Sequence, residues 1–422
     1  MSGIRHLLIF VLLLLCSSMG LGQSLSIAAN PVDGKQRDAF QRQINLFQQA
    51  HPDYRVTLKI YEHEQYKELV NASLAQGEAL ADVLFWFGGS TTRNFADKGW
   101  LSDLSELWRN ENWLESFSPA AISTVTRRGR QYGLPLYYYQ WGIYYRQSLF
   151  DKLQLRPAQT LEELDTLNER LREAGVTPFT LGSKNHWPAA AWFDYFNLRL
   201  NGIEFHETLL AGCHSFLDER VTRVIEAISE LVQRGDFIET PQENDWKGAL
   251  PFLYHNKAAM VLMGNFFLAS VPMSLQTDFA FAPFPLAEAG HAYVEDAPID
   301  ILIVPAASED TKARKDFLRM MAQPDTQSQL AASLNMIPPN RKSTLPANPH
   351  IRQGADLLNQ AAGLAQFFDR DTHPDFAQRA LPVLSRLFSE PASALRTQRE
   401  LEEARLAVWP NENRDRASCG GI

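Results

Sequence analysis

Strand-like and helix-like segments alternate through the first part of the chain, and this alternation limits the possible folds more than any other property. Residues 24–29, 54–60 and 83–87 have the composition of strands, whereas residues 40–47 and 64–76 have that of helices. Residues 83–87 are apolar at every position, as is typical of a strand buried on both faces of a parallel sheet. The order predicts a βαβαβ unit with right-handed crossovers, and therefore an α/β fold.

Candidate binding residues lie near the carboxyl ends of these strands. Ligands of open α/β sheets bind beyond the carboxyl ends of the strands. Asn30 follows the first strand and Glu62 follows the second, while Trp86 and Gly89 lie at the end of the third. Gly89 allows close approach of backbone N–H groups to a ligand, although a simple turn explains a glycine there equally well. These four residues are candidates for ligand contacts.

The amino-terminal residues have the pattern of a signal peptide. A charged pair at residues 5–6 precedes an apolar run at residues 7–15, and small residues follow. The run is too short to span a bilayer. We therefore predict that residues 1–22 are removed and that the mature chain is periplasmic. Lipid anchoring through Cys16 is the less favoured alternative, because Leu15 stands where a small residue normally precedes the cysteine.

Length and composition limit the function further. At 422 residues the chain exceeds what one hydrophobic core usually supports, so we expect two domains. The net charge of −9 disfavours nucleic acid as a partner. Neither a zinc-type spacing nor an HExxH or CxxC motif occurs in the sequence, so neither a metal nor another cofactor is expected. Whether Cys213 and Cys419 form a disulfide stays open.

A series of sequence blocks resembles a known family. The blocks are residues 132–135 (Tyr-Gly-Leu-Pro), 145–150, 157–164, 256–260, 264–266 (Gly-Asn-Phe), 317–330 and 337–341. They are similar, in the same order, to blocks of the family-one extracellular solute-binding proteins of ABC transporters, which include maltose- and glycerol-phosphate-binding members. The resemblance covers roughly residues 24–345.

This resemblance implies a two-lobe periplasmic-binding-protein fold, with a mainly parallel sheet flanked by helices in each lobe and hinge crossovers between the lobes. It places residues 23–136 in the first lobe, to which residues 298–341 return. Residues 137–297 form the second lobe, to which residues 342–422 return. It also implies that the chain is a monomer that binds a small-molecule sugar between the lobes and delivers it to an ABC permease.

A sugar site needs flat aromatic surfaces and fixed hydrogen-bonding groups, and clefts between domains are favoured places for it. The further candidates are Tyr139, Trp141, Trp187, Trp192, Asn265 and Phe266 in the second lobe, with Asp300 and Arg341 at the return crossovers. For each tryptophan, packing in the core is the competing explanation. Ala29 and Asn30 replace the family's aromatic pair after the first strand, and Phe266 replaces its tryptophan. The identity and length of the sugar therefore stay open.

Other functions are compatible with the sequence. The tyrosines at residues 137–139 could supply phenolate ligands to a ferric ion, which prefers hard oxygen donors. A sugar sensor that serves a signalling receptor would share the same fold. An exported glycan-active enzyme would need paired carboxylates or a nucleophile with its base. Since no nucleophile-elbow, phosphate-loop or metal motif occurs in the sequence, no catalytic residue is assigned.

Overall fold

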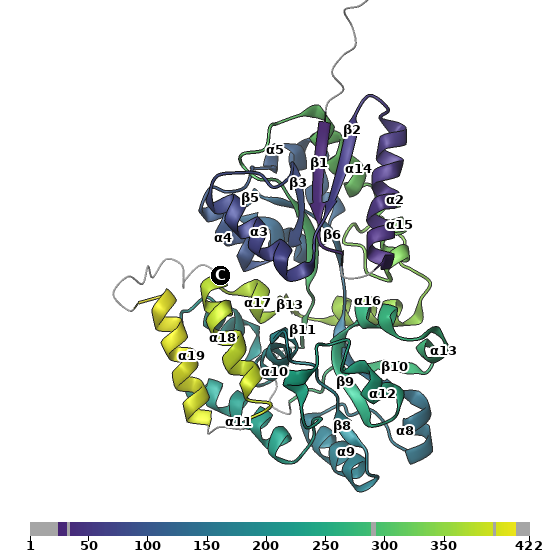
Figure 1. The fold of residues 1–422 in the computed structure, drawn as a ribbon, viewed down its shortest axis with the longest axis vertical. Helices are drawn as coiled ribbons and strands as arrows, with labels where there is room; N and C mark the ends of the chain where they lie inside the picture. The colour runs from purple at the N-terminus through teal and green to yellow at the C-terminus, as the bar shows by residue number, and fades with distance from the viewer. Residues whose placement is uncertain (1–23, 32–33, 288–292, 391–393, 411–422) are drawn as a thin grey trace, which may run out of the picture.

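The chain forms two lobes that meet at a waist (Figure 1). The computed structural model describes residues 24–31, 34–287, 293–390 and 394–410. The predicted signal peptide and Cys419 lie outside the described residues, and Cys213 is disulfide-bonded. Within the described ranges, no helix has the length and apolar composition needed to cross a membrane.

The first lobe is built on a five-stranded sheet with the order β2-β1-β3-β12-β6. The strands are β1 (Ser24–Ala29), β2 (Arg55–Ile60), β3 (Val83–Phe87), β6 (Gly133–Tyr138) and β12 (Ile299–Ile303). Since β12 runs antiparallel to both of its neighbours, it is the one reversed strand of this sheet. The helices α2 (Gly34–Ala50) and α3 (His63–Ala75) connect β1, β2 and β3, which confirms the predicted βαβαβ unit.

Apolar side chains at helical spacing hold α2 on this sheet. Phe40, Ile44 and Phe47 are buried, and the ring of Phe40 lies 4.0 Å from that of Phe85 on β3. All five residues of β3 are buried, as expected for a central strand. The other elements of this lobe are α4 (Ser90–Asp97), α5 (Ser105–Asn110), α6 (Trp113–Ser116), α7 (Pro119–Val125), β4 (Thr126–Arg127), β5 (Arg130–Gln131), α14 (Lys312–Ala322) and α15 (Pro324–Leu334).

The second lobe contains a four-stranded sheet with the order β10-β7-β9-β8. The strands are β7 (Trp141–Arg146), β8 (Thr177–Phe179), β9 (Ala258–Gly264) and β10 (Phe279–Ala282). Here β7 is the reversed strand, so in each sheet all strands but one point the same way, and the sheets are mixed because the reversed strand pairs antiparallel with its neighbours. The helices of this lobe are α8 (Gln147–Leu153), α9 (Leu161–Glu173), α10 (Trp187–Leu210), α11 (Glu219–Gln233), η1 (Pro241–Glu243), α12 (Leu250–Tyr254), η2 (Asn265–Ser270) and α13 (Met273–Gln276).

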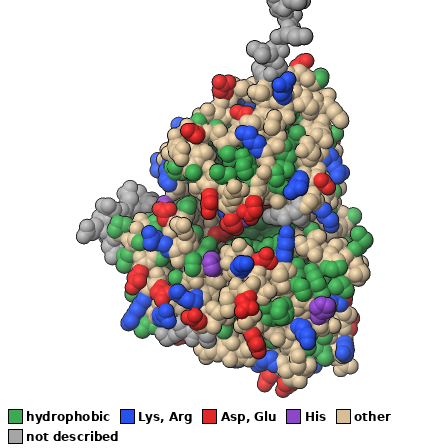
Figure 2. Space-filling view, in the orientation of Figure 1, with side chains coloured by type: hydrophobic (Ala, Val, Ile, Leu, Met, Phe, Trp, Pro, Cys, Tyr) green, Lys and Arg blue, Asp and Glu red, His purple; other side chains and the backbone are tan. Residues whose placement is uncertain are grey.

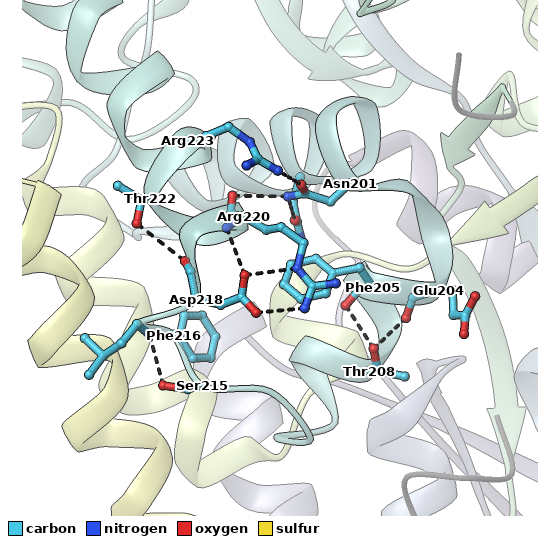
Figure 3. A network of polar contacts seen from close by, with 12 residues as sticks. Asn201, Glu204, Phe205, Thr208, Ser215, Phe216, Asp218, Arg220, Thr222 and Arg223 are labelled. Carbon is cyan, nitrogen blue, oxygen red and sulfur yellow. Dashed lines mark hydrogen bonds and ion pairs between the residues drawn. The ribbon is translucent and has the colours of Figure 1, made fainter. Parts of the chain in front are cut away.

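A polar network fixes the end of α10 against the start of α11 (Figure 3). The carboxylate of Asp218 accepts a hydrogen bond from the backbone N–H of Arg220 and pairs with the side chain of the same arginine. The hydrogen bond from Arg220 lowers the pKa of Asp218 to about 2. The guanidinium of Arg220 lies 3.7 Å from the ring centroid of Phe205, which belongs to α10 beyond its kink at Gly202. The helix cap, the ion pair and the cation–π contact therefore all stabilise the connection between α10 and α11.

Three segments connect the lobes. Residues 139–140 lead from β6 to β7, residues 297–298 lead from β11 (Val294–Asp296) to β12, and residues 335–348 lead from α15 to α16 (Pro349–Gln360). The strand β13 (Gly363–Ala365) pairs with β11 at the waist. The last helices are α17 (Phe368–Asp371), α18 (Pro374–Arg386) and α19 (Ala394–Val408), which pack around α10 and α11. The predicted lobe boundaries stay predictions.

Candidate functional site

A cavity of about 660 Å³ lies between the two lobes. Figure 2 shows the surface hollowed at the waist, with acidic side chains along the edge of the hollow. Residues from the ends of β1, β2 and β3 and from α2 and α3 line the cavity on the first-lobe side. Residues from β7, α10 and η2 line it on the second-lobe side, and α17 supplies residues between them. The volume is within the range of small-molecule sites.

The first-lobe wall is formed where the strands end. Asn30 follows β1, Glu62 follows β2, and Trp86 lies on β3 with only 4% of its surface exposed. Glu62 is also the N-cap of α3, where its carboxylate accepts a hydrogen bond from the N–H of Glu64. The side-chain amide of Asn30 hydrogen-bonds Nδ1 of His63 at 2.9 Å. These contacts fix the polar groups of the wall before a ligand arrives.

Charged groups on α3 extend this wall. Burial and then the positive charges of Lys67 and Arg370 lower the pKa of His63 well below its usual value, so its ring is neutral at neutral pH. The ammonium of Lys67 lies 3.6 Å from a carboxylate oxygen of Glu64 and 3.9 Å from one of Asp369. Because Asp369 belongs to α17, the second contact joins the first lobe to the carboxyl-terminal segment.

The second-lobe wall is aromatic. Trp141, at the start of β7, lies 4.2 Å from Phe367, 5.9 Å from Trp187 and 6.0 Å from Phe266, measured between ring centroids. Trp246 packs edge-on against Phe266 at 5.4 Å. Such a cluster presents broad apolar faces with a positive edge, and the indole N–H groups add polar handles.

Arg370 is the central cation of the site. Its guanidinium donates hydrogen bonds to the hydroxyl of Tyr139 at 3.0 Å and to a carboxylate oxygen of Asp300 at 3.2 Å. The same group lies 4.1 Å from the ring centroid of Phe87 on β3. Burial raises the pKa of Asp300, although the charge of Arg370 opposes the shift. Arg370 therefore connects α17 to β3, β12 and the segment that follows β6.

Three buried polar atoms on residues that line the cavity have no hydrogen-bond partner among the described residues. They are the Nε1 atoms of Trp86 and Trp141 and the Oδ1 atom of Asp194. An unsatisfied buried polar group is costly, so native proteins usually pair such a group with a ligand, an ion or an ordered water molecule. The two indole nitrogens can only donate, whereas a carboxylate oxygen accepts. The arrangement therefore suits a ligand whose groups do both.

Eight of the twelve predicted site residues line this cavity. They are Asn30, Glu62, Trp86, Tyr139, Trp141, Trp187, Phe266 and Asp300. They come from both lobes and from the crossovers between them, so folding brings together residues that are up to 270 positions apart in the sequence. That they contact a ligand stays a prediction.

Trp192 and Asn265 are buried away from the cavity. Trp192 is fully buried on α10, where its ring packs edge-on against Phe179 at 4.7 Å and Phe237 at 4.9 Å. Asn265 is 2% exposed, and its side-chain amide donates a hydrogen bond to the carbonyl of Asn335. Neither side chain lines the cavity, although the Nε1 atom of Trp192 and the Oδ1 atom of Asn265 have no hydrogen-bond partner among the described residues. That these two residues contact a ligand stays a prediction.

Gly89 and Arg341 are also outside the cavity. The N–H of Gly89 donates to the carbonyl of Thr124 at 2.9 Å, and the residue is the N-cap of α4. Its backbone therefore binds another part of the chain. Arg341 is exposed, and its N–H donates to the carbonyl of Ser116. It lies on an outer loop of the crossover, so neither Gly89 nor Arg341 lines the cavity, and a ligand contact of either residue stays a prediction.

Sequence reasoning missed several lining residues, including those on the carboxyl-terminal segment. Phe367 and Arg370 belong to a stretch for which no periodic pattern pointed to the waist. Trp246 stands in a polar loop, which is the same signal that selected Trp187. Asp194 is a single carboxylate within the apolar run of residues 188–196, and a charge in such a run could have identified it.

The clustered tyrosines are engaged in hydrogen bonds and have raised pKa values. Tyr137 accepts a hydrogen bond from the side chain of Gln36, and Tyr139 accepts one from Arg370. Burial raises the pKa of both phenols, which opposes the phenolate form that a ferric ion would need. In the part of the chain that the structure describes, no group of three His, Cys, Asp or Glu side chains is arranged to hold a metal ion.

Two sheets in separate lobes with a lined cavity between them form a two-lobed α/β fold. The family described as bacterial extracellular solute-binding protein matches residues 32–328, and the chain belongs to this family. This membership confirms the resemblance seen in the sequence.

The relatives and solved structures agree with this class. The chain is 23% identical over 326 residues to an uncharacterized ABC transporter extracellular-binding protein of Pyrococcus horikoshii, with 75% of this chain and 71% of the relative covered. It is 22% identical to the alpha-glucosides-binding periplasmic protein AglE of Rhizobium meliloti, with 80% and 77% covered. The solved structure of the bacterial solute receptor AcbH superimposes with a TM-score of 0.85 at 22% identity, covering 92% of this chain and 99% of that one.

Proposed function

We propose that this protein is the sugar-binding component of an ABC-type uptake system. It captures a mono- or oligosaccharide in the cavity between its lobes and delivers it, unaltered, to a membrane permease. The observation that carries the proposal is the lining of the cavity, where aromatic faces from both lobes surround buried hydrogen-bonding atoms that lack a partner among the described residues.

The chemistry of a sugar matches this lining. A sugar ring has apolar C–H patches on its faces and hydroxyl groups around its rim. Aromatic rings such as those of Trp141, Trp187 and Phe266 suit the faces. Hydroxyl groups both donate and accept, so they can pair with the indole N–H groups and with carboxylates such as that of Asp194.

The named ligands of relatives support the same class. One relative is the alpha-glucosides-binding protein AglE, and another is the melibiose/raffinose/stachyose-binding protein MelE of Bacillus subtilis, which is 21% identical with 74% of each chain covered. Because the family is extracellular, the permease is the expected partner and the periplasm the expected location. We further propose that residues 1–22 act as a cleaved signal peptide and that the mature protein is a monomer.

A binding function also accounts better for the charged groups than catalysis does. Asp300 is bonded to Arg370, and the carboxylate of Glu62 caps a helix. A glycoside hydrolase needs two carboxylates placed on either side of one bond, with at least one free to move a proton. We therefore propose that the ligand leaves the site chemically unchanged.

Thermal shift against a panel of ligands tests the proposal. A ligand that binds only the folded state raises the melting temperature. The panel contains galactose, maltose, melibiose, raffinose and chitobiose, together with ferric nitrilotriacetate and the buffer alone. We expect at least one saccharide to raise the melting temperature and the ferric complex to leave it unchanged. A shift with ferric nitrilotriacetate alone, accompanied by visible absorption, would contradict the proposal.

A further inference from the structure

Asp194 projects from α10 at the edge of the cavity and is fully buried. One carboxylate oxygen accepts a hydrogen bond from the backbone N–H of Phe368 at 2.9 Å. The other, Oδ1, has no partner among the described residues. Asp194 is thus a preorganised hydrogen-bond acceptor, because the bond to one oxygen fixes the orientation of the carboxylate while the second oxygen has no partner within the described part of the chain.

A second carboxyl group, that of Asp296, lies on β11, which packs against α10. It is fully buried, and neither of its oxygens has a hydrogen-bond partner within the described part of the chain. Burial and the charge of Asp194 both raise the pKa of Asp296 well above its usual value. Burial likewise raises the pKa of Asp194, while the N–H of Phe368 opposes the shift. Two such groups cannot both be ionised at low cost.

The surrounding charges do not neutralise the pair. The charged groups that face it are Glu295, Asp369, Asp371 and Arg370, and the phenol of Tyr195, whose pKa burial raises well above its usual value, also faces Asp296. Each of the four charged groups already has a partner of opposite charge: Glu295 pairs with Arg199, Asp369 with Lys67, Asp371 with Arg93 and Arg370 with Asp300. The pair must therefore reduce its own charge by retaining a proton. Because only Asp194 receives a backbone N–H, the negative charge is better placed on Asp194 and the proton on Asp296.

We propose that the site takes uncharged saccharides and rejects sugar acids and sugar phosphates, that the carboxylate of Asp194 with its unpaired oxygen makes this selection, and that Asp296 on the neighbouring β11 carries the proton of the pair. The inference rests on the proposed function and names the ligand class. A hydroxyl group can donate to Oδ1 of Asp194, whereas a carboxylate or phosphate at the same place would meet a like charge. Asp296 contacts no ligand and is a positioning residue.

The first experiment needs no ligand. Asp296 keeps its proton in the folded protein at a pH where the unfolded chain has released it, so stability falls as pH rises from about 4 toward neutrality. Asp296→Asn mimics the protonated group and removes that part of the fall. We expect the melting temperature of Asp296→Asn to exceed that of the wild type by a margin that grows between pH 4.5 and pH 8. The control is Asp356→Asn, an exposed carboxylate on α16, for which the margin should stay flat.

Infrared spectroscopy of the wild type at pH 7 gives an independent measurement. We expect an absorption band of a protonated carboxyl group that Asp296→Asn removes and Asp356→Asn retains. A melting-temperature margin that does not depend on pH, or the absence of this band, would overturn the assignment of the proton. Neither result depends on which ligand is bound, so a failure here is distinct from a failure of the proposed function.

The second experiment measures selectivity by calorimetric titration at pH 7. The probes are matched pairs that differ only at C6: galactose with galacturonate, and glucose with glucuronate. We expect the neutral member of the pair that binds to bind at least about tenfold more tightly than its acid. Asp194→Asn should weaken binding of the neutral sugar and reduce this ratio, whereas Asp296→Asn should preserve both. Equal affinity of the wild type for a sugar and its acid would overturn the selection. If no saccharide binds at all, the proposed function fails while the proton assignment stands.

Discussion

Replacing Arg370 by methionine tests the ion pair between Arg370 and Asp300 at the centre of the site. The substitution keeps the length of the side chain but removes its charge, leaving Asp300 with only 16% of its side chain exposed and without its cation. Removing one partner of a buried ion pair typically costs about 3–5 kcal/mol. Since Asp300 keeps a hydrogen bond from Tyr137, we expect the lower end, a loss of about 3 kcal/mol in the free energy of unfolding at pH 7.

Asp300→Asn in the same background should recover part of this loss, because it removes the uncompensated charge. Urea unfolding without saccharide, followed by both tryptophan fluorescence and circular dichroism, measures the four proteins of this double-mutant cycle. The coupling between the two residues should be about 2 kcal/mol. The direction in which the stability deficit of Arg370→Met changes with pH also follows from the ion pair. Arg370→Met raises the folded-state pKa of Asp300 further, so its deficit relative to the wild type should shrink as pH falls toward 4.

Arg341→Met is the matched control. Arg341 is exposed and lies outside the cavity, so its replacement should change the free energy of unfolding by no more than about 0.5 kcal/mol. Two results would refute the role of the Arg370–Asp300 ion pair in stabilising the waist. One is an Arg370→Met variant as stable as this control, and the other is an Asp300→Asn substitution that recovers none of the lost free energy of unfolding.

Three further substitutions separate binding from packing. Trp141→Ala should lower saccharide affinity by more than about tenfold. Because the ring of Trp141 packs 4.2 Å from that of Phe367, the substitution should also lower the free energy of unfolding by about 3 kcal/mol. An unchanged affinity in calorimetric titration would contradict the place of Trp141 in the site. Gly264→Ala places a methyl group 2.5 Å from the ring of Phe266, so affinity should fall as the rings shift, and a normal titration would show that they adapt. Trp192→Ala should lower the melting temperature but leave the affinity of the folded protein unchanged; weaker binding would place it in the site after all.

Local patterns predicted the elements of the fold well. The buried run of β3 and the apolar stripe of α2 each reflect one periodicity, which physical chemistry ties to one kind of structure. The right-handed crossover rule then fixed how β1, β2 and β3 assemble. Residues at the ends of these strands, such as Asn30 and Trp86, were predicted to lie at the cavity because the topology places strand ends there.

The rest of the site depends on contacts between distant segments, which no local pattern reports. Arg370 reaches the cavity because α17 packs between α10 and α4, and that packing is set by the whole tertiary structure. Trp192 and Trp187 are five residues apart on one helix, yet one is core and the other lines the cavity. The orientation of α10 against the second sheet determines which tryptophan is packed in the core and which one lines the cavity. Polar residues precede Trp187, whereas Trp192 stands within an apolar run, and this local difference agrees with the outcome but does not by itself give the orientation of the helix.

A crystal structure of the protein with the saccharide that gives the largest thermal shift tests the central claim most directly. The account predicts one intact saccharide in the cavity between the lobes. It should contact Trp86 from the first lobe and Trp141 from the second, with a hydroxyl group within hydrogen-bond distance of Oδ1 of Asp194. A saccharide bound outside this cavity, or held by residues of one lobe only, would contradict the account. A cleaved or otherwise altered sugar in the cavity would replace the binding function by an enzymatic one.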